Sequence, residues 1–215
     1  MAKLPVHTIF LLSPANLGGV RGGLVFNPGA EFPLARQLQS GGASIGELFS
    51  FISSLYFRGK VAYSAAFGRP PRGVAGALVI TPGAGLRLLH EMVTVECLRS
   101  WAAVPIDAKN SRFTEPLVDH ATALVRAHGK TTRFVLLGSV ASGKYVEPLV
   151  EVFGDSLHFP RDFVGRGDMS RGGLMLRAAR DGNELAYAPV RGTKRHGPRP
   201  ARLVREGRAS RPRMA

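Results

Sequence analysis

The stretch Arg133-Phe-Val-Leu-Leu-Gly-Ser-Val-Ala-Ser-Gly-Lys-Tyr-Val-Glu-Pro-Leu-Val-Glu-Val-Phe-Gly154 predicts how this chain folds. Its apolar run at 134–137 is typical of a buried strand, and Gly138 ends that run. A helical pattern follows over 145–153 and stops at Gly154. A strand, a glycine-containing loop and a helix in this order place backbone N–H groups where they bind anions, most often phosphate. The segment therefore predicts an α/β protein with a functional crevice.

Apolar strands and amphipathic helices alternate along the rest of the chain. Runs at 6–12, 76–81 and 156–160 predict three further strands. Helices are expected at 32–38, 48–57, 60–67, 95–103 and 114–128. Gly59 is expected to separate the second helix from the third, and Thr114 to open the last one. Strands separated by helices favour a single domain with a central, mainly parallel sheet covered on both faces.

The charge of the chain is unevenly distributed. The net charge is +14, and nine of the 29 Lys and Arg residues lie in 191–215 beside one acid, Glu206. This segment is also rich in Gly and Pro, and such a composition buries too little apolar surface to offset chain entropy. We expect an α/β domain over 1–190 and a disordered basic tail over 191–215. The tail either attracts DNA or RNA through counterion release or serves only to keep the chain in solution.

Composition also excludes several classes of protein. The single cysteine, Cys97, allows no intrachain disulfide, and the apolar N-terminal stretch is too short to span a membrane. The histidines show no paired metal-binding spacing, so no metal site is expected. These features predict a cytoplasmic protein that is not inserted in a membrane.

The loop of the opening stretch matches the phosphate-loop spacing G-x4-G-K. Tyr145 stands where such loops carry the Ser or Thr that binds magnesium, and a phenol does not fit that role. Simple anion binding at the helix start needs only the loop and its backbone amides. Gly138, Ser139, Lys144 and Tyr145 are therefore predicted to bind ligand. The alternatives are a phosphate-loop enzyme and a plain strand-to-helix turn with a solvated lysine.

A second glycine-rich segment, 165–173, is expected to form a loop. Its glycines would permit a close approach to a ligand, and arginine forks suit phosphate. Arg166, Ser170 and Arg171 are predicted to bind ligand, and Asp168 is the candidate catalytic acid or base. The alternative is a sharp turn in which Asp168 pairs with one of the arginines.

Two further groups of polar residues are candidates. Ser13 and Asn16 follow the first strand, where ligands of open α/β sheets bind. Tyr56, Arg58 and Lys60 combine an aromatic ring with positive charge, as sites for bases and phosphates do, and Tyr63 is expected to point into the same cleft. Aromatic residues at helical spacing are otherwise typical of a core.

The order of several short motifs resembles a known superfamily. These motifs are Leu12-Ser13-Pro14, Leu55-Tyr56 with Ala62-Tyr63, Val79-Ile80-Thr81 with Gly85-Leu86, Leu137-Gly138 with Tyr145-Val146-Glu147-Pro148-Leu149, and the glycine-rich 165–173. Over about residues 6–177 the chain resembles the superfamily of the YaaA-like peroxide-stress-resistance proteins and the core domain of archaeosine synthase. The resemblance implies DNA binding, or modification of a nucleobase in RNA.

Taken together, the turns at 13–16, 81–83 and 138–139 are expected to surround one crevice, with 165–173 and 56–60 closing over it. We expect a nucleic-acid-associated protein that binds or modifies a nucleotide or nucleobase there. The alternatives are a phosphate-loop enzyme acting on a nucleoside triphosphate and a non-catalytic interaction module that docks a protein partner.

Overall fold

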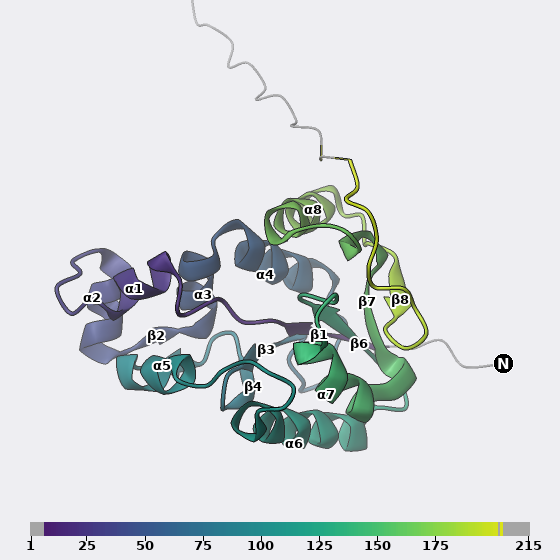
Figure 1. The fold of residues 1–215 in the computed structure, drawn as a ribbon, viewed down its shortest axis with the longest axis horizontal. Coiled ribbons are helices and arrows are strands. Elements are labelled where there is room, and N and C mark those ends of the chain that lie inside the picture. The colour runs from purple at the N-terminus through teal and green to yellow at the C-terminus, as the bar shows by residue number, and fades with distance from the viewer. Residues whose placement is uncertain (1–6, 202, 204–215) are drawn as a thin grey trace, which may run out of the picture.

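The computed structural model describes residues 7–201 and 203, and over these residues it contains a central six-stranded sheet (Figure 1). The strand order is β4-β3-β1-β6-β7-β8. The strands are β1 (His7–Leu12), β3 (Ala77–Thr81), β4 (Gly85–Leu88), β6 (Thr132–Leu137), β7 (Leu157–Pro160) and β8 (Tyr187–Pro189). Strands β3, β1, β6 and β7 are parallel to one another, and the edge strands β4 and β8 are antiparallel to their neighbours. The expected α/β fold with a mainly parallel sheet is confirmed.

The direction in which the sheet grows reverses at β1. The chain passes from β1 to β3 on one side and then crosses to β6 and β7 on the other side. Leu12 at the end of β1 pairs with Val79 and Leu137, and the Ser13 N–H donates to the Leu137 carbonyl at 3.2 Å. The carboxyl ends of the three neighbouring strands are therefore level, and a reversal of this kind opens a crevice between the loops that follow.

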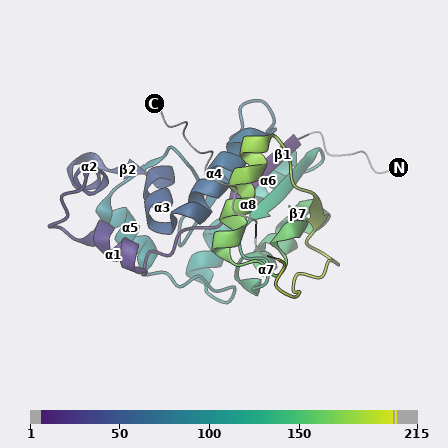
Figure 2. The ribbon, with the colours of Figure 1, turned by 90° about the horizontal axis from the view of Figure 1, so that it is seen from above.

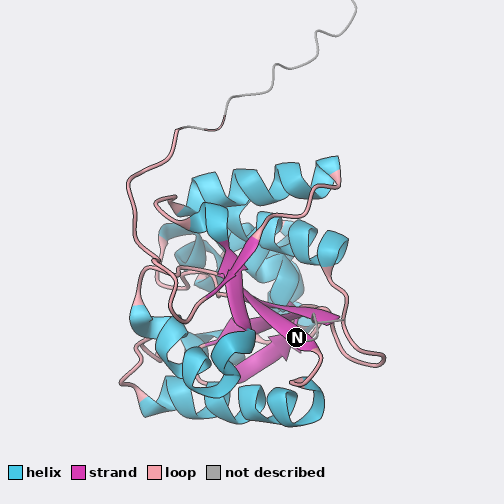
Figure 3. Cartoon of the chain, turned by 90° about the vertical axis from the view of Figure 1, so that its right-hand side faces the viewer, coloured by secondary structure: helices cyan, strands magenta, loops and turns pink. Residues whose placement is uncertain are grey.

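Helices cover both faces of the sheet. Helices α4 (Leu55–Phe67) and α8 (Asp168–Asp181) pack on one face, and α6 (Ser111–His128) and α7 (Gly143–Phe153) pack on the other (Figures 1 and 3). Residues 9–12 and 134–137 of the two central strands are completely buried. Continuous apolar strands are what a sheet covered on both sides requires.

A smaller group of helices lies beyond the carboxyl end of β1, at the left of Figure 1. It consists of α1 (Val20–Phe26), α2 (Pro33–Gly41), α3 (Ile45–Ser53) and α5 (Val95–Ala102), with the short strands β2 (Ala43–Ser44) and β5 (Met92–Val93) paired antiparallel. Ser44 caps α3: its Oγ accepts from the Glu47 N–H at 3.3 Å, and the Glu47 carboxylate accepts from the Ser44 N–H. This reciprocal capping fixes where α3 begins.

The structure corrects the expected separation of helices at Gly59. The break falls at Ser54, whose φ of 46° is the one left-handed value among non-glycine residues of the described chain, and Gly59 lies inside α4. A Cβ on Gly59 would come 2.7 Å from the Gly172 carbonyl oxygen, and a Cβ on Gly172 would come 2.7 Å from that of Leu55. Helices α4 and α8 run side by side in Figure 2. The two glycines allow their backbones to come into contact.

The same contact explains why the expected loop at 165–173 is wrong. Helix α8 begins at Asp168, and Gly172 serves helix packing instead of ligand approach. Thr114 also does not open its helix: α6 starts at Ser111 behind Asn110 and continues through Pro116. In both places tertiary packing overrides the local preference of Gly or Pro for a loop.

The first part of the expected tail lies against the domain. Arg195 Nη1 donates to the Val140 carbonyl at 3.2 Å, and Arg166 Nη1 donates to the Ala201 carbonyl at 3.5 Å. The remainder of the expected tail, except residue 203, lies outside the described residues. None of the helices in the described part of the chain is both long enough and apolar enough to cross a bilayer.

Candidate functional site

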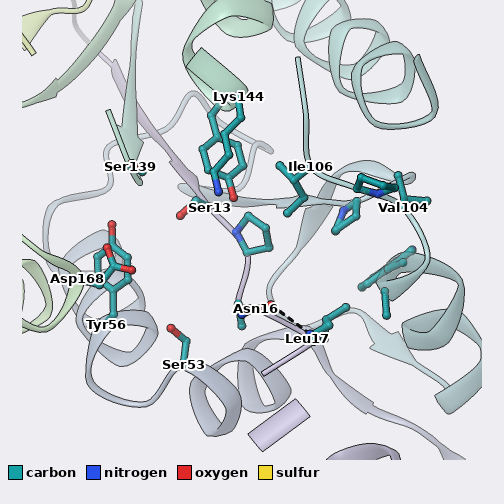
Figure 4. Close-up of a pocket in the computed structure, with 18 residues that line it drawn as sticks. Ser13, Asn16, Leu17, Ser53, Tyr56, Val104, Ile106, Ser139, Lys144 and Asp168 are labelled. Carbon is teal, nitrogen blue, oxygen red and sulfur yellow. Dashed lines mark hydrogen bonds between the residues drawn. The ribbon is translucent and has the colours of Figure 1, made fainter. Parts of the chain in front are cut away.

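A cavity of about 530 Å³ lies at the carboxyl ends of β1, β3 and β6 (Figure 4). The segments expected to surround the crevice and close over it all contribute to its lining, through 13–16, Pro82, Ser139 with 144–145, Asp168 and Tyr56. Tyr56 and Asp168 stand together on one side of the cavity, and the apolar side chains of Val104 and Ile106 stand on the opposite side. The site thus has one polar wall and one apolar wall.

Ser13 lies at the end of β1 and is held by a buried lysine. Lys60 of α4 is fully buried, and its Nζ lies 2.8 Å from the Ser13 Oγ and 2.8 Å from the Ser13 carbonyl oxygen. The ring of Tyr56 lies beneath the same nitrogen, 3.9 Å from Nζ to the ring centroid. Burial lowers the pKa of Lys60 to about 7, although the nearby Asp168 carboxylate opposes this shift. Lys60 thus joins Ser13 and Tyr56 in one buried cluster.

Tyr56 lines the cavity, and its hydroxyl is buried. Its side chain is 4% exposed, and its Oη has no hydrogen-bond partner among the residues that the structure describes. Burial raises the pKa of Tyr56, and the nearby Arg171 guanidinium acts in the opposite direction. A buried hydroxyl without a partner is uncommon in native proteins, and this one belongs to a residue that lines the cavity.

Arg171 connects α8 to the segments around Phe163 and Gly138. Its Nε and Nη2 donate to the Phe163 carbonyl at 3.3 and 3.2 Å, and its Nη1 donates to the Gly138 carbonyl at 3.5 Å. Nη1 also lies 3.6 Å from the Asp168 carboxylate, which is itself largely exposed at the mouth of the cavity. The fork of Arg171 is therefore occupied, so the expected phosphate clamp is not available there, whereas Asp168 remains accessible.

The loop after β6 places Lys144 in the cavity but differs from a phosphate loop. Tyr145 is buried and packs edge-on against Phe113, with 6.2 Å between ring centroids. Burial raises the pKa of Tyr145. The Glu147 carboxylate folds back over the start of α7, since a Cβ on Gly143 would overlap its Oε1. A negative charge at this position repels a phosphate that approaches the N-terminal amides.

Several predicted site residues lie elsewhere. Arg58 is exposed and does not line the cavity. Arg166 and Ser170 hydrogen-bond to each other at 3.2 Å and line a separate groove on the other side of α8. Gly138 lets its loop pass close to Ser13, because a Cβ there would come 2.9 Å from the Ser13 Cβ. Tyr63 is also directed away from the cavity, toward Tyr187.

The apolar wall is the part of the site that the sequence patterns missed. It is formed by Trp101, Ala102, Val104, Pro105 and Ile106, at the end of α5 and just beyond it. Trp101 is the single tryptophan of the chain. The available signal was the apolar run that continues past the end of the helix into a loop, where exposure would otherwise favour polar residues.

Among the residues that the structure describes, no group of three or more His, Cys, Asp or Glu side chains is placed to hold a metal ion. Comparison of the chain with models of protein families, with curated proteins and with solved structures found no match. The chemistry of the site is therefore argued from its own geometry.

Proposed function

We propose that this chain is a cytoplasmic, nucleic-acid-associated protein whose cavity binds a nucleotide or a nucleobase displaced from a strand. The observation that carries the proposal is the convergence of three strand ends on one cavity, with Lys144 and Asp168 at its edge. Ligands of open α/β sheets bind at this position, where the strand order reverses.

The size and lining of the cavity support a ligand of this class. Its volume of about 530 Å³ falls within the range of small-molecule sites. The apolar wall around Trp101 and Ile106 suits the flat face of a base, and Lys144 suits a phosphate. The Asn16 Oδ1 accepts from the Gly18 N–H at 3.1 Å, which leaves the amide nitrogen of Asn16 to donate to a base edge.

The charge distribution supports a nucleic-acid partner. The nine Lys and Arg residues of 191–215 add sequence-independent affinity for polyanions. The resemblance in motif order to proteins that bind DNA or modify a nucleobase in RNA points the same way.

Ligand binding is tested by titration with nucleobases, nucleosides and nucleoside monophosphates. Trp101, the single tryptophan, lines the cavity, so its fluorescence reports binding directly. We expect saturable binding of a nucleoside monophosphate, and about 10-fold weaker binding in Lys144→Ala because a charge-assisted hydrogen bond is lost. Lys130→Ala is the matched control, since Lys130 is exposed and lies between α6 and β6 at the opposite ends of the strands. Equal affinity in both variants would contradict the proposal.

Nucleic-acid association is tested with labelled single- and double-stranded DNA and RNA. The full chain is compared with a chain ending at Ala201, because residues up to Ala201 contact the domain. We expect the shorter chain to bind more weakly and with a smaller dependence on salt concentration, since fewer counterions are released. Absence of binding by the full chain at low salt would end this part of the proposal.

The phosphate-loop alternative has less support, because Tyr145 is buried against Phe113 and Glu147 covers the first turn of α7. It predicts magnesium-dependent binding of ATP or GTP, whereas the proposed site predicts binding that magnesium does not alter. An interaction module that docks a protein partner would leave the cavity without a small-molecule ligand in the same titration.

A further inference from the structure

The contact between Ser13 and Lys60 is placed for chemistry as well as for structure. The Lys60 Nζ is 2.8 Å from the Ser13 Oγ, and Ser13 lines the cavity while Lys60 lies behind it, fully buried. A ligand in the cavity therefore meets the hydroxyl of Ser13, with an amine on the far side of that hydroxyl. Nucleophile and base within hydrogen-bond reach are the arrangement of covalent catalysis.

The surroundings of Lys60 accommodate both protonation states of its amine. The ammonium form has three N–H donors, and it finds the Ser13 carbonyl, the Ser13 Oγ and the face of the Tyr56 ring at 3.9 Å. The neutral form donates to the Ser13 carbonyl and accepts the Oγ–H with its lone pair. Burial favours the neutral form, and the apolar rings of Tyr56 and Phe57 supply that burial.

We propose that Ser13 and Lys60 form a serine–lysine catalytic dyad, in which Ser13 is the nucleophile and Lys60 the general base, and that the dyad cleaves a carboxylic ester bound in the cavity. Serine–lysine pairs perform acyl transfer on unrelated folds, so the function follows from the geometry and not from the fold. This activity goes beyond nucleotide binding and does not require it.

The reaction proceeds in two balanced steps. In the first, the Ser13 Oγ attacks the ester carbonyl carbon, its proton moves to the Lys60 Nζ, and the carbonyl electrons move to oxygen. The C–O bond to the alcohol then breaks, and the departing alkoxide takes the proton from Lys60. In the second step water attacks the acyl-serine, Lys60 accepts its proton and returns it to the Ser13 Oγ, and the carboxylic acid leaves.

The cavity supplies a charge for the oxyanion that forms in both steps. Lys144 lines the same cavity as Ser13, so its ammonium group is available to the negative oxygen. Lys144 touches the substrate in this scheme, whereas Asp168 at the mouth acts on Lys60 through its charge.

Covalent labelling of the full chain with a fluorophosphonate tests the dyad. The reagent forms a bond from phosphorus to the serine oxygen and releases fluoride, and it carries no nucleobase, so failure here is distinct from failure of nucleotide binding. We expect mass spectrometry of peptides to place the label on Ser13, and p-nitrophenyl acetate to be hydrolysed at the same site. Ser40→Ala is the control, because Ser40 is exposed and lies outside the cavity.

The role of Lys60 is separated from a purely structural one by two measurements. Lys60→Met keeps the length and the apolar burial of the side chain, and we expect labelling of Ser13 to slow about 100-fold or more, the usual worth of a general base. In the unmodified chain the labelling rate is expected to rise with pH through about 7 and then level off, as Lys60 loses its proton. The groups that face Lys60 are Asp168, Arg171, Tyr56 and Ser13.

The pH profile needs no variant, so the proposal remains testable if Lys60→Met fails to fold. Labelling of Ser13 that slows in folded Lys60→Met and follows this profile supports the dyad. An unlabelled Ser13, a label confined to other serines, or a labelling rate independent of both Lys60 and pH would overturn it, and Lys60 would then only anchor the turn after β1.

Discussion

The two ends of α4 carry the same side chain in opposite circumstances. Tyr56 and Tyr63 are seven residues apart, two turns of one helix, and both are buried. The Tyr63 hydroxyl lies 2.7 Å from the Tyr187 hydroxyl and accepts from the Leu185 N–H at 2.9 Å. The Tyr56 hydroxyl has no such partner in the described chain.

The charged groups at the two ends of α4 also differ. Beside Tyr63, Glu184 is paired with Arg69 and Arg133, and this network closes the sheet at the amino ends of its strands. Beside Tyr56, Lys60 is buried without a salt bridge to any carboxylate of the described residues, and it lies behind the cavity. The contrast lies in the two hydroxyls, since Arg133 Nε and Glu184 Oε1 at the Tyr63 end also lack hydrogen-bond partners among the described residues. A hydroxyl with two partners contributes to stability, whereas the end with Lys60 borders the cavity and is the candidate for function. The difference between the two ends can be tested by substitution.

The largest effect is expected from Lys60→Met measured across pH. The folded pKa of Lys60 is about 7, below the ordinary value of 10.5, so the folded state binds fewer protons than the unfolded state between these limits. Stability contributed by this group is therefore highest above pH 10.5, falls as pH decreases, and reaches its minimum below pH 7. Relative to Lys60→Met, the unmodified protein is expected to gain up to about 1.4 kcal/mol per pH unit over this window. Urea unfolding of both proteins at pH 7, 8, 9 and 10 measures the gain. If the free energy of unfolding changed with pH equally in both, the lowered pKa of Lys60 would be contradicted.

The next largest effect is expected where α8 meets the Tyr56 end of α4. Gly172→Ala places a Cβ 2.8 Å from the Tyr56 Cα, and we expect a loss of about 3 kcal/mol because backbone must move. Gly173→Ala is the control: its Cβ meets only the Leu203 Cδ1 at 3.5 Å, and alanine favours the helix. Chemical denaturation compares the two. Equal stability would show that the close approach of the helices is not required.

A smaller effect distinguishes the two tyrosines directly. Tyr63→Phe leaves the Leu185 N–H and the Tyr187 hydroxyl without this partner, and we expect a loss of about 1–2 kcal/mol. Tyr56→Phe removes a hydroxyl that has no hydrogen-bond partner among the described residues, so stability should be unchanged or slightly higher while ligand binding decreases. Thermal and urea unfolding of both variants test the difference. A larger loss of unfolding free energy in Tyr56→Phe than in Tyr63→Phe would contradict the view that the Tyr63 hydroxyl serves stability and the Tyr56 hydroxyl does not.

The smallest effect is expected at Arg58, on the outer face of the same helix. Its side chain is exposed and lies outside the cavity, so Arg58→Ala should alter neither unfolding nor the fluorescence titration. A marked loss of nucleotide affinity in this variant would show that Arg58 contributes to ligand binding.

The sheet and the position of the cavity were predictable because they follow from local patterns. Apolar runs identify strands, and the carboxyl ends of parallel strands meet at one edge, which brings Ser13 and Ser139 together. The helix boundaries around 165–173 were not predictable, because Gly172 is placed by its contact with α4. Glycine-rich sequence alone does not distinguish a ligand loop from a close helix crossing.

The buried lysine was only partly predictable. Tyr56, Lys60 and Tyr63 are spaced i, i+4 and i+7, which places them on one face of a continuous helix. An expected break at Gly59 concealed that face, since Tyr56 then belonged to a different helix from Lys60 and Tyr63. Once α4 is continuous from Leu55 to Phe67, the pattern identifies Lys60 as inward-facing and Arg58 as outward-facing.

The depth of Lys60 has a consequence for chemical footprinting. An amine with so low a pKa would ordinarily be the first to react with acetic anhydride or a succinimidyl ester near neutral pH, because its lone pair is free. Here the residue is fully enclosed, and the hydroxyl of Ser13 stands between it and the cavity. In the native protein such acylating reagents should modify exposed lysines such as Lys130 while sparing Lys60, and its modification would therefore report local opening of the fold.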